Sequence, residues 1–114
     1  MATIADLKAY GANTDAALAR MMGNEDFYLR LIPRVFDDTN FDLLPQSISE
    51  GNLEKAFEAA HSLKGVLGNL ELTPLLTPIV EVTELLRARK EIDYTPYLEE
   101  IAKQKEALIK LFGE

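Results

Sequence analysis

Apolar residues recur at three- and four-residue spacing along most of the chain, and no stretch alternates between apolar and polar positions as a strand would. This spacing is typical of amphipathic helices. The predicted helices cover residues 3–9, 14–22, 25–36, 41–50, 53–70, 73–90 and 95–112. The connections between them are short, so neighbouring helices should pack antiparallel. The pattern therefore predicts an all-α fold, an antiparallel four-helix bundle with one or two short extra N-terminal helices across one end.

Turn-forming residues mark where the predicted helices begin. Asn52 is suited to cap the helix that follows it, because its side chain can accept a hydrogen bond from a free backbone N–H. Thr73 and Pro74 have the order expected of a cap and a first helical position. Pro78 then fits only if that helix starts near Thr77 or if its first turn is distorted.

Residues 53–70 have two distinct faces when they are placed on a helix at about 100° per residue. The face opposite His61 is apolar and should be buried; it comprises Ala56, Ala59, Leu63, Val66, Leu67 and Leu70. His61 lies in the middle of the other face, which also carries Phe57, Lys64, Gly65 and Gly68. The pattern predicts an imidazole that projects outward from a helix whose back is held in a core.

The residues around His61 indicate a chemistry for this outer face. A glycine inside a helix costs about 0.5–1 kcal/mol relative to alanine, so Gly65 and Gly68 suggest room kept clear for an approaching group. A neutral imidazole nitrogen is a nucleophile near pH 7. The ammonium group of Lys64, one turn away, can hold an anion delivered to it. Together they form a site that could accept a phosphoryl group from another protein.

Each of these residues also has a structural interpretation. His61 could be an ordinary surface histidine, and Lys64 could pair with Glu54 or Glu58 on its own helix. Gly65 and Gly68 could serve close packing against a neighbouring helix. Phe57 could pack at the edge of the core or belong to an apolar docking ring around His61, and the sequence favours neither.

Composition narrows the function classes. At 114 residues, 47% of them hydrophobic, the chain is expected to form one domain over residues 1–114 with a single core. The net charge is −7 and no cluster of Lys and Arg is present, which argues against nucleic-acid binding and against anionic membranes. The chain has one histidine and no cysteine, so a zinc site is not expected. The lack of cysteine fits a cytoplasmic protein.

The string His61-Ser62-Leu63-Lys64-Gly65 is similar to the signature of histidine-containing phosphotransfer (HPt) domains of two-component phosphorelays. The resemblance covers about residues 24–90, and other positions that match are Phe36, Glu50-Gly51-Asn52, Ala60 and Asn69-Leu70. The chain departs from the family pattern at Glu71-Leu72, where many members have a glycine. The end of the histidine helix must therefore be made in another way.

The resemblance implies that His61 is phosphorylated reversibly on Nε2 and that Lys64 contacts the phosphoryl oxygens. Gly65, Gly68 and Phe57, on the same face of the helix, are the candidates for access and docking. The resemblance also implies a response-regulator receiver domain as partner, and a sensor histidine kinase acting directly or through such a receiver. Mg²⁺ is expected on the receiver and no cofactor in the domain itself. The domain would be a cytoplasmic monomer and a phosphocarrier, not an enzyme. Two alternatives stay open: a phosphoacceptor domain excised from the N-terminus of a chemotaxis-type histidine kinase, and a non-catalytic helical adaptor.

Overall fold

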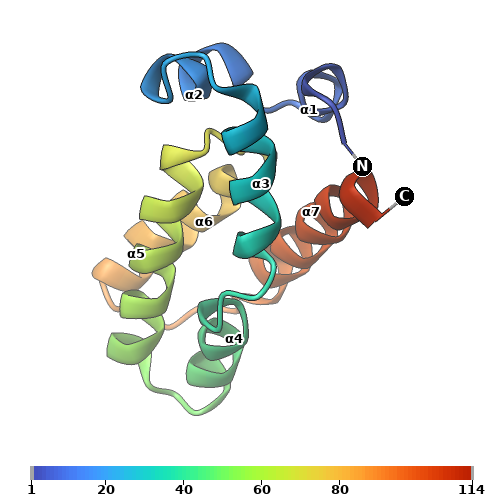
Figure 1. The fold of residues 1–114 in the computed structure, drawn as a ribbon. Helices are drawn as coiled ribbons and strands as arrows, with labels where there is room; N and C mark the ends of the chain where they lie inside the picture. The colour runs from blue at the N-terminus through green and yellow to red at the C-terminus, as the bar shows by residue number, and fades with distance from the viewer. Residues whose placement is uncertain (1, 114) are drawn as a thin grey trace.

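The computed structural model describes residues 2–113, and within that range it contains helices and no strand. Seven helices follow one another within these residues (Figure 1). Their bounds are α1 Ile4–Tyr10, α2 Thr14–Arg20, α3 Glu25–Val35, α4 Asn40–Ser49, α5 Leu53–Asn69, α6 Thr73–Arg87 and α7 Thr95–Gly113. The all-α fold class is thereby confirmed. None of the helices in the described part of the chain is both long and apolar enough to span a bilayer.

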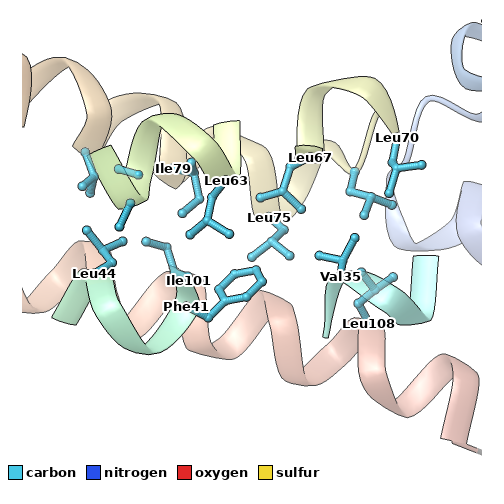
Figure 2. Close-up of a cluster of buried hydrophobic side chains, with 14 of the residues drawn as sticks. Val35, Phe41, Leu44, Leu63, Leu67, Leu70, Leu75, Ile79, Ile101 and Leu108 are labelled. Atoms are coloured by element: carbon cyan, nitrogen blue, oxygen red, sulfur yellow. The ribbon is translucent and has the colours of Figure 1, made fainter. Parts of the chain in front are cut away.

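Helices α4 to α7 form the bundle. Helix α5 packs against α4 on one side and α6 on the other, and α7 packs against α6. Residues 50–52 join α4 to α5 and residues 70–72 join α5 to α6, so successive helices run in opposite directions (Figure 1). Leucine, isoleucine and aromatic side chains from these helices meet in one core; those labelled in Figure 2 include Phe41, Leu44, Leu63, Leu67, Leu75, Ile79, Ile101 and Leu108.

Asparagine caps fix the starts of three helices. The side-chain oxygens of Asn13, Asn24 and Asn52 each accept a hydrogen bond from the backbone N–H three residues ahead, at 3.2, 3.0 and 3.1 Å. Such a bond satisfies one of the backbone donors that the first helical turn leaves free. The predicted cap at Asn52 is confirmed, and it sets the first turn of α5.

The N-terminal helices α1, α2 and α3 precede the bundle, and α1 and α2 lie across the end where α5 turns into α6 (Figure 1). Gly11 ends α1 with φ of 115°, and a Cβ built on it would come within 2.9 Å of Pro74 Cγ in α6. A side chain would be strained there by both the backbone and the contact. The backbone N–H of Asn13 donates to the carbonyl of Glu71 at 3.0 Å, and the Tyr28 hydroxyl donates to that of Leu70 at 2.7 Å.

The cap of α6 lies one residue before the predicted Thr73. The helix begins at Thr73, its N-cap is Leu72, and Pro74 is its second residue. It continues through Pro78, whose side chain is buried, so of the two options considered for Pro78, a start near Thr77 is wrong. Because Pro78 lies in the second turn, its missing N–H leaves only the Pro74 carbonyl without a helical bond. The burial of Pro78 in the core helps to offset that loss.

Candidate functional site

Helix α5 holds His61 on its exposed face and packs the opposite face into the core. Its buried residues are Ala56, Ala59, Ala60, Leu63 and Leu67, each at most 3% exposed. The outward projection of His61 is therefore confirmed. One expectation for the buried face is wrong, because Val66 is 37% exposed. It borders a hollow between α3 and α5, which Leu31, Arg34 and Asn69 also line.

The two glycines of α5 face open space. A Cβ added to Gly65 or to Gly68 would meet no atom within 4 Å. Neither glycine is therefore required for close packing against a neighbouring helix. Both leave free surface beside His61, as the interpretation of room kept clear predicts.

Phe57 contacts His61 one turn earlier on α5. The two rings stack with their centroids 5.6 Å apart and an angle of 20° between their planes. Two guanidinium groups also lie over the Phe57 ring. That of Arg87 is 4.9 Å from the ring centroid and that of Arg89 is 5.4 Å from it. Phe57 is half-buried, so it belongs both to the edge of the core and to the surroundings of His61. The contact restricts the orientation of the imidazole and brings two positive charges close to it.

Lys64 pairs across helices and not along its own. Its Nζ lies 3.9 Å from Oε2 of Glu84 on α6, and among residues 2–113 it makes no ion pair with Glu54 or Glu58. Glu84 also accepts a hydrogen bond from Arg87 Nε at 3.4 Å. The Lys64 and Glu84 side chains are 38% and 55% exposed. An ion pair so open to water contributes about 0–1 kcal/mol, so Lys64 can exchange Glu84 for another anion.

These residues border one open depression of about 450 Å³. His61, Lys64, Gly65 and Gly68 line it together with Arg20 from α2 and Glu71 from the α5–α6 turn. The structure thus brings four of the five predicted residues into the lining of one depression. The fifth, Phe57, is not part of the lining but stacks on His61, which is. The depression could hold a small anionic group against His61 and leaves space for a partner surface above it.

Comparison with known families agrees with this geometry. The family model of the Hpt domain matches residues 37–110, which is most of the chain. The chain belongs to the Hpt family. Comparisons with curated proteins and with solved structures gave no significant match.

The function of the chain follows from its family. An Hpt domain carries phosphoryl groups on histidine within a phosphorelay, and it has no catalytic activity of its own. Its partners are other phosphorelay proteins. Helices α1 to α3 lie before the matched residues, so part of the depression is built by chain outside the family match.

Arg20 is the residue of the Hpt depression that sequence reasoning missed. It comes from α2, and its Nη1 reaches the carbonyl oxygens of Gly68 and Asn69 at 2.9 and 3.1 Å and the Glu71 carboxylate at 2.7 Å. A single arginine at the end of a short helix, 41 residues before His61, carries no pattern that would reveal this contact. The only signal was the missing glycine after Asn69-Leu70.

Arg20 and Glu71 together make the helix end for which many family members use glycine. Glu71 has φ of 54°, a left-handed conformation that glycine adopts most easily. Its N–H donates to Gly68 and that of Leu72 to Leu67, each at 3.2 Å, which is a Schellman turn. Arg20 donates a further hydrogen bond to the Gly68 carbonyl, donates another to the Asn69 carbonyl, and pairs with the Glu71 side chain. Burial, and to a smaller extent the charge of Glu71, raise the pKa of the adjacent Tyr28 to about 12.

Proposed function

We propose that His61 is the phosphoacceptor of this Hpt domain, and that it exchanges the phosphoryl group with the aspartate of receiver domains. One observation carries the proposal: His61, the only histidine of these 114 residues, presents its ring at an open depression beside Lys64. Histidine phosphotransfer needs an exposed imidazole nitrogen, and no other residue of this sequence offers one.

The proposed transfer is a single displacement at phosphorus. The lone pair of His61 Nε2 attacks the phosphorus of the aspartyl phosphate, the N–P bond forms, and the bond to the aspartate oxygen breaks. The released carboxylate keeps the bonding electrons, and the proton on Nδ1 stays in place. Lys64 leaves Glu84 and pairs with the phosphoryl oxygens. Mg²⁺ on the receiver would neutralise part of the charge that develops on them.

The other residues of the site serve approach and orientation. Gly65 and Gly68 leave room for the receiver to bring its aspartate into line with Nε2, because any larger side chain would project into the depression. Phe57 holds the imidazole plane by stacking on it. We further propose that the protein acts in the cytoplasm as a monomer, where a sensor histidine kinase supplies the phosphoryl group directly or through a receiver.

A phosphotransfer profile tests this proposal. Purified receiver domains from the same genome are phosphorylated and mixed with wild-type protein and with His61→Gln, and a second arm offers purified sensor kinases with ATP. The wild type should gain an acid-labile, base-stable label from at least one donor, and His61→Gln should gain none while its circular dichroism is unchanged. An equal label on His61→Gln, or no label on the wild type from any donor, would reject the proposal.

A further inference from the structure

Arg20 adds a positive charge to the depression from outside the residues that match the family. It lies in α2, whereas the match begins at residue 37. Its guanidinium lines the same hollow as His61 and Lys64, and its side chain is 51% exposed. The chain as a whole has a net charge of −7, so a positive charge in this depression is opposite in sign to the net charge of the protein.

The contacts of Arg20 leave part of the guanidinium available. Within residues 2–113, its hydrogen bonds to the Gly68 and Asn69 carbonyls and its contact with Glu71 all use Nη1. A guanidinium has five N–H donors arranged as a planar fork, so Nη2 and Nε can bind a second carboxylate while Nη1 keeps its partners. The same side chain can therefore close the helix end and contact a partner.

Distance along α5 decides which group Arg20 can reach. Gly68 follows His61 by seven residues, which corresponds to about 10 Å along the helix axis. Arg20 Nη1 binds at the Gly68 end of this interval, at 2.9 Å from its carbonyl. A phosphoryl group on His61 would lie near the other end, within reach of Lys64. Arg20 is thus placed to contact the protein that delivers the phosphoryl group and not the group itself.

We infer that Arg20 is a docking residue that pairs with a carboxylate of the receiver domain and favours receivers that carry an acidic side chain at that position. This inference rests on the proposed function. A receiver that holds Mg²⁺ beside its aspartate would bind it through one or two carboxylates, so acidic side chains would lie near the surface that meets His61. Two acidic surfaces repel each other, and a cation at the rim lowers that repulsion and speeds association.

The experiment uses the receiver that transfers fastest in the profile described above. Initial rates are measured over a range of receiver concentrations for the wild type, Arg20→Gln, Arg20→Lys and Glu71→Gln. Lys103→Gln, on the exposed surface of α7, is the control for losing one positive charge away from the depression. Labelling by phosphoramidate, a small donor that needs no docking surface, is measured in parallel for every variant.

For Arg20→Gln the receiver concentration at half-maximal rate should rise about 3- to 10-fold, as expected for one half-exposed charge pair, with the maximal rate within about twofold. The effect should shrink at high salt. Arg20→Lys should recover only part of the loss, because an ammonium group keeps the charge but lacks the planar fork. Lys103→Gln should behave as wild type. Phosphoramidate labelling should be unchanged in all variants. Glu71→Gln should lose less than Arg20→Gln, because Arg20 keeps its charge and its hydrogen bonds to the Gly68 and Asn69 carbonyls.

Three results would overturn the inference. One is an unchanged half-maximal concentration for Arg20→Gln. Another is an equal loss for Glu71→Gln, which would mean that only the closure of the helix end matters. The last is a parallel loss of phosphoramidate labelling, which would place the effect on His61 or on folding. A wild-type protein that no receiver labels would instead reject the proposed function, and this inference with it.

Discussion

The two faces of α5 differ in what surrounds them. On one face, Leu63 and Leu67 have no exposed surface and are enclosed by side chains from the other bundle helices (Figure 2). On the other, His61 is exposed and the space above Gly65 and Gly68 is empty. The packed face fixes the helix, so the exposed face can present a reactive group without any packing of its own. Stability and phosphotransfer should therefore respond to different substitutions in the same helix.

The largest expected effect comes from the packed face. Leu63→Ala should lower the free energy of unfolding by about 2–5 kcal/mol, because it leaves a cavity among side chains that cannot fully collapse. Urea unfolding followed by circular dichroism measures this loss. Ser62→Ala, on the adjacent exposed position, is the matched control and should change stability by less than about 0.5 kcal/mol. Similar losses for both would contradict the division into two faces.

The next effect concerns the end of the packed face, where the Tyr28 hydroxyl binds the Leu70 carbonyl. The pKa values of Tyr28 and Tyr10 are each raised to about 12, mainly by burial, from 10.0 in the unfolded chain. A raised pKa means that the folded state favours the neutral hydroxyl. This preference contributes fully to the free energy of unfolding below about pH 10, and the contribution is lost as the pH rises through 12.

Urea unfolding at a series of pH values tests this. The free energy of unfolding should fall steeply between pH 10 and 12 in the wild type. In Tyr28→Phe the fall should be shallower, and stability at pH 7 should already be lower by about 1 kcal/mol, because the hydrogen bond to Leu70 is lost. Equal slopes for the two proteins would show that Tyr28 does not titrate as described.

The smallest expected effect is on the exposed face of α5. There one substitution should raise the stability of the fold and lower the rate of phosphotransfer. Gly65→Ala should raise the free energy of unfolding by about 0.5–1 kcal/mol, because alanine is the better helix former and its methyl group meets no atom. The same methyl group narrows the depression, so transfer from a receiver, measured as an initial rate, should slow. Gly51→Ala is the control: Gly51 has φ of 74°, and alanine there should destabilise the fold without touching the site.

Sequence reasoning predicted the features that depend on local pattern. The phase of α5 follows from the spacing of its leucines and alanines, so the exposure of His61 and the shared face of Lys64, Gly65 and Gly68 follow from the order of residues alone. The cap at Asn52 is equally local. Val66 was misplaced because helical phase gives the direction of a side chain and not whether another helix covers that direction.

Contacts between distant segments could not be derived in this way. The two guanidinium groups on Phe57 come from the last residue of α6 and from Arg89 just after it, some 30 residues later in the chain. The contact of Arg20 with the α5–α6 turn joins segments separated by 48 residues. Both depend on how the helices cross, which hydrophobic spacing does not determine. The sequence did show at Glu71 that the usual helix end was missing, although it did not show what replaces it.

The contacts that α1 to α3 make with the rest of the molecule limit how this protein can be cut or recombined. The family match begins at residue 37, yet Leu7, Tyr28 and Ile32, all fully buried, come before that point. A fragment trimmed to the matched residues would expose the apolar surface that these side chains cover and would leave the Gly68 and Asn69 carbonyls without Arg20. Any exchange of this relay module between signalling proteins should therefore keep its cut point upstream of α1.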